Sequence, residues 1–117
     1  MKKLSLYWLI MASFWSLTVL GAGDPQKGTE LYQLYCTQCH GINGNGKGIN
    51  ITDMAVLPRD HTDKQEMSAR TDEDLIKAIT HGGKSVNKSV LMPAWGNNLS
   101  EAQVLDLVAY LRELCCN

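Results

Sequence analysis

Apolar residues recur at the three- and four-residue spacing of amphipathic helices in three stretches of the chain, and no stretch alternates as a half-buried strand would. The first pattern predicts a helix from Pro25 to about Tyr35, with Asp24 as its N-cap and Pro25 at a position where a missing N–H is harmless. Gly28 weakens this helix unless a neighbouring helix has to approach closely there.

The other two helical patterns carry start signals. Ser100 and Gln103 have the spacing of a capping box ahead of an apolar stripe, which predicts a last helix running to about Leu114. Thr71 begins a cap of the same kind, and the middle helix behind it should end at Gly82. The pattern therefore predicts an all-α fold with three or more helices.

Residues 1–23 have the layout of a signal peptide. Two lysines precede an apolar run over residues 4–20, and small residues follow it, which favours cleavage after Ala22 or Gly23. The run is longer than the ~7 to 15 residues usual for a cleaved signal, so an uncleaved membrane anchor is the alternative. Either outcome places residues 24–117 outside the cytoplasm, which for a bacterial-looking signal means the periplasm.

Residues 24–117 are enough for one small domain and too few for two. A chain of this length buries only roughly 60 to 65% of its unfolded surface, so a bound cofactor would supply much of the missing apolar volume. We expect the last helix to cross the first near Gly28, with Tyr110 or Leu107 in the space that a side chain would have taken.

The charge balance limits the classes of partner that the protein is expected to bind. The chain has 11 basic and 12 acidic residues, and loss of Lys2 and Lys3 with a cleaved leader leaves the mature part slightly acidic. Such a balance argues against nucleic acid or anionic lipid as a partner. A membrane association is expected only if residues 4–20 remain as an anchor.

Residues 36–40, Cys-Thr-Gln-Cys-His, supply two thiols and an imidazole within one helical turn. This pattern is typical of c-type haem attachment. A zinc site would need a second pair of ligands, but the only other cysteines are Cys115 and Cys116, adjacent at the end of the chain. A thioredoxin-like dithiol belongs in an alternating β/α pattern, which is absent. The sequence predicts one covalent haem c on Cys36 and Cys39, with His40 on the iron.

The second iron ligand has several candidates, namely Met54, Met67, Met92, His61 and His81. Met92 lies in a loop between the middle and last helices, and Pro93 restricts its backbone to an extended conformation. That restriction would hold the thioether over the haem face opposite His40. Trp95, three residues on, is expected to pack on the haem rim with its N–H free for a propionate.

The remaining candidates have plainer interpretations. Met54 and Met67 are expected to fill the core, as most methionines do. His61 lies in a polar stretch and is expected at the surface or beside a propionate, and His81 stands at a helix C-terminus, where the dipole favours an imidazolium. The glycine-rich segment 41–50 should wrap one haem edge, because no P-loop Lys-Ser/Thr follows it.

Taken together, the motifs resemble those of the small single-haem class I cytochromes c, in the branch similar to the haem modules of cbb3-type oxidases. The motifs that carry the resemblance are Gly28 with Tyr32, residues 36–41, the glycine segment, residues 57–60, residues 92–96 and the last helix. The resemblance implies a cytochrome c fold, with crossed N- and C-terminal helices and the haem in a crevice.

The resemblance also implies roles for two further residues. The backbone carbonyl of Pro58 would accept a hydrogen bond from the second ring nitrogen of His40, which raises the basicity of the imidazole. Arg59 would be either a propionate partner or a solvated arginine. Cys115 and Cys116 have no counterpart in the family pattern, and a disulfide between them, a disulfide-linked dimer and free thiols are all open.

With both axial positions of the iron taken by His40 and Met92, the sequence predicts a one-electron carrier and not an enzyme. Its partners would be a redox donor and acceptor, such as an oxidase, reductase or dehydrogenase, and the chain would be a monomer unless Cys115 or Cys116 links two copies. Lys47, Lys84 and Lys88 would guide docking or simply solubilise the protein. The alternatives are a haem sensor with a labile Met92 and an anchored subunit of a larger complex.

Overall fold

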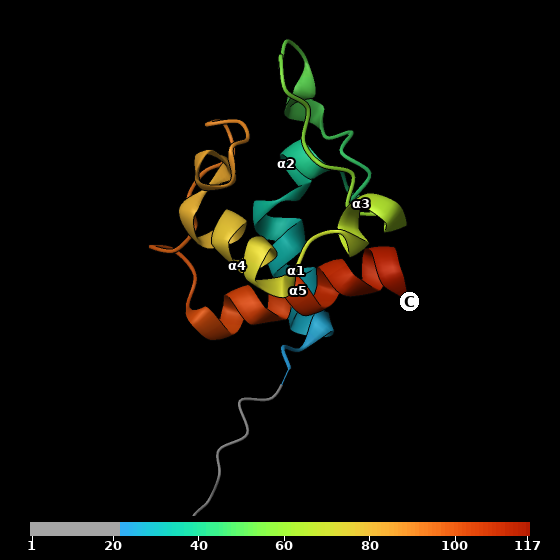
Figure 1. The fold of residues 1–117 in the computed structure, drawn as a ribbon, viewed down its shortest axis with the longest axis vertical. Helices are drawn as coiled ribbons and strands as arrows, with labels where there is room; N and C mark the ends of the chain where they lie inside the picture. The colour runs from blue at the N-terminus through green and yellow to red at the C-terminus, as the bar shows by residue number, and fades with distance from the viewer. Residues whose placement is uncertain (1–21) are drawn as a thin grey trace, which may run out of the picture.

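The computed structural model describes residues 22–117, and no strand occurs within them. The elements are α1 (Pro25–Tyr35), α2 (Thr37–His40), η1 (Ile49–Ile51), α3 (Lys64–Ser68), α4 (Asp72–His81), η2 (Gly83–Val86) and α5 (Glu101–Cys116), shown in Figure 1. The all-α fold is confirmed. Most of the signal peptide predicted over residues 1–23 lies outside the described residues. None of the helices in the described part combines the length and apolar character that crossing a bilayer requires.

The three predicted helices are present with their predicted caps. The Asp24 carboxylate accepts hydrogen bonds from the first backbone N–H groups of α1, and both α4 and α5 begin with a complete capping box. Helix α5 runs two residues beyond the predicted Leu114. The helical turn expected over the attachment motif is α2. The sequence pattern missed α3, because five residues are too few to display a helical period.

Helix α5 crosses α1, as Figure 1 shows, and the closest approach is at Gly28. A Cβ atom on Gly28 would collide with the carbonyl oxygen of Asp106 and lie 2.8 Å from the Cβ of Tyr110. The side chain that occupies the crossing is therefore Tyr110, whereas Leu107 is buried in the core. The backbone N–H of Asp24 adds a second tie between the helices through its 2.7 Å hydrogen bond to the Asp106 carboxylate.

Replacing Gly28 with alanine should destabilise the domain by about 1 to 3 kcal/mol, because the new methyl group meets a helix backbone that cannot rotate away. Urea unfolding of the haem-loaded protein measures the change. Lys27→Ala, at the exposed neighbouring position of the same helix, is the control and should stay within about 0.5 kcal/mol of the wild type. Equal midpoints for the two variants would contradict the close crossing.

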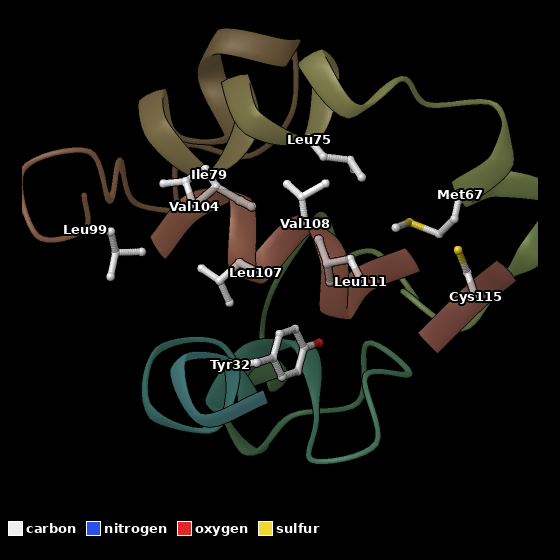
Figure 2. Packing of buried hydrophobic residues seen from close by; sticks show 10 residues of the cluster. All are labelled: Tyr32, Met67, Leu75, Ile79, Leu99, Val104, Leu107, Val108, Leu111 and Cys115. Carbon is white, nitrogen blue, oxygen red and sulfur yellow. The ribbon is translucent and has the colours of Figure 1, made fainter. Parts of the chain in front are cut away.

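The apolar stripe of α5 forms the centre of the core. Figure 2 shows it between Tyr32 of α1 on one side and Leu75 and Ile79 of α4 on the other. The buried cluster consists of Tyr32, Met67, Leu75, Ile79, Leu99, Val104, Leu107, Val108, Leu111 and Cys115. Met67 is fully buried in this cluster, which confirms its predicted role as core filler.

The short helix α3 is held against α5 by Arg112. The guanidinium donates to the backbone carbonyls of Met67 and Arg70, at 2.8 and 2.6 Å, and to the carboxylate of Asp72 at 2.8 Å. One side chain thereby satisfies two carbonyls at the α3 end and joins the start of α4 to the last helix. The segment between α2 and α4 is thus fixed to the core despite its short helix.

Cys115 and Cys116 form a disulfide with each other at the end of α5. Of the three possibilities that the sequence left open, the structure shows this one. With both sulfurs bonded within one chain, neither is available in this state for a disulfide to a second copy.

Candidate functional site

A cavity of about 920 Å³ lies between the end of α1, helices α2 and α4, and the loops that precede α3 and α5. Its volume falls within the range of roughly 300 to 1,000 Å³ typical of cofactor sites. The residues predicted to hold or surround the haem all line this one cavity, namely Cys36, Cys39, His40, Pro58, Arg59, Met92 and Trp95. Segments more than 50 residues apart in the sequence thus meet at a single site.

The attachment motif follows directly on the end of α1. Cys36 is the C-cap of that helix, and the single turn α2 then presents Cys39 and His40 to the same cavity. Both cysteines are free thiols. Burial, and then the neighbouring Cys39, raise the pKa of Cys36 to about 12, so its thiol stays protonated. A redox-active dithiol needs a lowered pKa instead, and this disfavours the thioredoxin-like reading.

A zinc site is disfavoured on ligand number. Within residues 22–117, no three His, Cys, Asp or Glu side chains gather closely enough to hold a metal ion by themselves. Structural zinc requires four protein ligands, and the second cysteine pair is bonded to itself at the end of α5.

The imidazole of His40 is oriented by a backbone hydrogen bond. Its Nδ1 lies 3.0 Å from the carbonyl oxygen of Arg59, and because a carbonyl only accepts, Nδ1 carries the proton. Burial lowers the pKa of His40, which keeps the ring neutral. The lone pair of Nε2 is therefore left to bind a metal.

The prediction that Pro58 accepts this hydrogen bond was wrong by one residue. The acceptor is the carbonyl of Arg59, while that of Pro58 faces the glycine segment and would lie 2.8 Å from a Cβ on Gly46. The two carbonyls point to different neighbours, so only that of Arg59 faces His40.

Met92 enters the cavity from the loop between η2 and α5. Its carbonyl accepts a hydrogen bond from the N–H of Gly83 at 3.1 Å, and two residues beyond Pro93 the N–H of Trp95 donates to the carbonyl of Ile79 at 2.9 Å. The loop is therefore tied to η2 at Met92 itself and to α4 just beyond Pro93. The methionine is half-buried and its backbone has little freedom to move.

Met54 also lines the cavity and is half-buried, which differs from the predicted core position. It follows η1, and its N–H donates to the carbonyl of Ile51 at 3.1 Å within the same short loop. Two thioethers therefore face the site. Met92 has the more firmly fixed backbone of the two.

Trp95 and Arg59 stand on the cavity wall with protein partners of their own. The ring of Trp95 packs at 5.2 Å from the ring of Tyr35, and the guanidinium of Arg59 forms an ion pair with Glu66 at 2.5 Å. Glu66 also lies 3.6 Å from Arg70. Both arginines line the cavity, so this cluster presents positive charge where a carboxylate could approach.

The glycine segment does not wrap the cavity as predicted. Of residues 41–50, only Asn50 lines it. The glycines instead permit close approaches within the protein: Gly46 has φ of +78° against the carbonyl of Pro58, and a Cβ on Gly48 would collide with the carbonyl of Gln38. Their small size serves backbone packing around the attachment motif.

The prediction that His61 lies at the surface was also wrong. It is 8% exposed, its Nδ1 lies 2.9 Å from the hydroxyl of Tyr32, and its ring stacks on that of His40. Asp60 accepts hydrogen bonds from both the backbone N–H and the hydroxyl of Thr62, which makes a turn that directs His61 inward between polar neighbours. No periodic pattern carries that information. His81, by contrast, is exposed at the end of α4, where it was predicted.

An all-α fold with crossed terminal helices, and an attachment motif that opens on a cofactor-sized cavity, define a c-type cytochrome domain. The matching family model is described as cytochrome c oxidase, cbb3-type, subunit III, and it covers residues 23–111. The chain belongs to this family.

Individual relatives agree with the family. The chain is 29% identical over 102 residues to the cbb3-type cytochrome c oxidase subunit FixP of Azorhizobium caulinodans, a match that covers 85% of this chain and 31% of FixP. The chain thus spans about a third of the length of that relative. Among solved structures, the KustC0563 c-type cytochrome is 26% identical with a TM-score of 0.61, over 75% of this chain and 96% of that one.

The fold also matches cytochrome c6 from the diatom Phaeodactylum tricornutum, with 24% identity and a TM-score of 0.53 over 76% of this chain and 91% of that one. This likeness concerns the fold alone. The family and the KustC0563 cytochrome identify the cofactor as a covalent haem c, one per domain of this size, and the role as electron transfer.

Proposed function

We propose that residues 24–117 are an exported one-electron carrier in which Cys36 and Cys39 hold one haem c and His40 and Met92 ligate its iron. The observation that carries the proposal is that both ligand segments, from opposite ends of the domain, open on one cavity. Bound there, the haem supplies one-electron chemistry at its iron.

The residues around the site favour that chemistry over ligand binding. The hydrogen bond from His40 to the Arg59 carbonyl orients the imidazole and raises its basicity. A thioether from Met92 favours the reduced state of the iron and raises the reduction potential. With both ligands in place, no coordination position is left for dioxygen or peroxide, so we propose electron transfer and not catalysis.

The lysines at and beside the cavity are the proposed contacts for a redox partner, and Asp60, Asp63, Glu66 and Asp74 line the same cavity. Lys77 and Lys88 line the cavity, and Lys84 is exposed in η2 beside it, whereas Lys47 is exposed on the glycine segment, outside the cavity lining. Lysines at a cavity mouth steer an acidic redox partner by long-range attraction. We propose a periplasmic respiratory oxidoreductase as that partner, and among the predicted lysines we assign docking to Lys84 and Lys88.

The absorption spectrum tests the proposed ligands. The oxidised protein should show the charge-transfer band of a sulfur-to-iron bond, and carbon monoxide should leave the spectrum of the reduced protein unchanged at neutral pH. Both results follow if His40 and Met92 occupy the two axial positions. Rapid binding of carbon monoxide would instead support a sensor with a labile methionine.

A second candidate is a subunit of a larger complex, which the similarity to part of FixP favours. Such a subunit would keep residues 4–20 as an anchor, whereas a carrier would lose them. Mass spectrometry of the purified protein separates the two, because an intact Met1 contradicts cleavage after Ala22 or Gly23.

A further inference from the structure

His61 is fixed at both its backbone and its side chain. The backbone N–H donates to the carbonyl of Gly44 at 2.7 Å, and Nδ1 of the ring lies 2.9 Å from the hydroxyl of Tyr32. Tyr32 is only 1% exposed, so both partners of this hydrogen bond are buried. A buried polar pair of this kind holds its two rings in one arrangement, because either ring alone would leave an unsatisfied group.

The proton in this pair belongs to the tyrosine. Burial raises the pKa of Tyr32 well above its usual range, so the hydroxyl keeps its proton and donates to Nδ1 of His61. Nδ1 of His61 thus accepts the hydrogen bond, and the fixed ring presents a flat face to its neighbour.

That face lies against the ring of His40. The two ring centroids are 4.2 Å apart, and the ring planes differ by 19°. The hydrogen bond from His40 to the Arg59 carbonyl anchors one edge of the imidazole, but rotation about the terminal side-chain bond of a histidine is intrinsically broad. The ring of His61, stacked on the face of the His40 imidazole, blocks the rotation that the single hydrogen bond at its edge would allow.

Tyr32, which holds His61, is itself held by its packing between α1 and α5. Tyr32 packs edge-to-face on Tyr110 of α5, with centroids 5.1 Å apart and an interplanar angle of 65°. Figure 2 shows Tyr32 facing the apolar stripe of α5. The position of His61 is therefore set by the contact between α1 and α5 and not by the loop alone.

We infer that His61 is a positioning residue, whose ring, held by Tyr32, fixes the plane in which the His40 imidazole presents Nε2 to the haem iron. The inference rests on the proposed role of His40 as an iron ligand. The orientation of an axial imidazole is visible in the electron paramagnetic resonance g-values and in the haem-methyl NMR shifts of the oxidised protein, which a purely structural role would leave unchanged.

Three variants of the haem-loaded protein test the inference. His61→Leu removes the stacked ring and should change both the g-values and the pattern of methyl shifts. His61→Phe keeps a flat ring and should restore the wild-type pattern when combined with Tyr32→Phe, which removes the hydroxyl that would otherwise lack an acceptor. Tyr32→Phe alone is the mildest change. It removes the hydrogen bond to His61, so the ring of His61 should become more mobile and the electron paramagnetic resonance lines should broaden.

His81→Leu is the matched control, since it makes the same substitution at an exposed histidine and should leave both spectra as in the wild type. Wild-type g-values and methyl shifts in a folded His61→Leu protein would overturn the inference. So would a Tyr32→Phe/His61→Phe double variant that behaves like His61→Leu. Should His61→Leu fail to fold, unchanged spectra in Tyr32→Phe would overturn it.

The charge-transfer band of the wild type separates this inference from the proposed function. Its presence supports the His40 and Met92 ligands whatever the His61 variants show. Absence of the band would contradict the proposed His40 and Met92 ligands. If the band is present but the spectra of the His61 variants match the wild type, only the positioning role of His61 is contradicted.

Discussion

Replacement of both Cys36 and Cys39 by alanine should give a protein without covalent haem and with little folded structure. Leu34, Leu57 and Leu91 line the cavity and are more than half exposed, so contacts within the protein do not bury them. A domain of this size has little core to lose, and the cofactor is expected to cover this apolar lining. Intact mass and far-ultraviolet circular dichroism of the purified variant measure the two effects.

The second cysteine pair provides a matched control. Cys115→Ala/Cys116→Ala makes the same two substitutions at the end of α5, away from the cavity, and should keep the haem and the helical signal. A Cys36→Ala/Cys39→Ala protein that folds and retains a covalent haem would contradict the attachment site.

Replacement of Met92 by alanine should lower the reduction potential and open the iron to carbon monoxide, while the haem stays attached. Loss of the thioether removes the ligand that favours reduced iron, and axial ligands tune haem potentials over a range of about 0.8 V. Redox titration and the reduced spectrum with carbon monoxide measure the change.

Met54 is the control for this experiment, because its thioether lines the same cavity. Met54→Ala should leave the potential near that of the wild type and the iron closed to carbon monoxide. If Met54→Ala lowered the potential and opened the iron while Met92→Ala did neither, Met54 would be the ligand. The fixed loop around Met92 would then serve packing alone.

Helices with strong local signals were predictable from the sequence. The reciprocal caps of α4 and α5 depend on residues three positions apart, so they are readable without a structure. The attachment motif is likewise local, since five adjacent residues carry its chemistry. The crossing at Gly28 could be anticipated because a glycine within a helical pattern needs a packing reason.

The environment of His40 could not be predicted in the same way. The acceptor is Arg59 and not Pro58, and which carbonyl faces the ring depends on how the chain turns after residue 57. His61 stacks on His40 from 21 positions away, and its hydrogen bond to Tyr32 spans 29 positions. Contacts of this kind are set by the tertiary fold and leave no period in the sequence.

The bond between Cys115 and Cys116 differs from most disulfides in what it can do for the fold. The stabilisation that a cross-link gains by restricting the unfolded chain grows with the length of the loop it closes, and a link between adjacent residues closes almost none. Its thermodynamic contribution is correspondingly small, so the integrity of the domain depends on helix packing and the cofactor. While that bond is intact, any pairing of two molecules at this end of α5 has to be reversible and non-covalent.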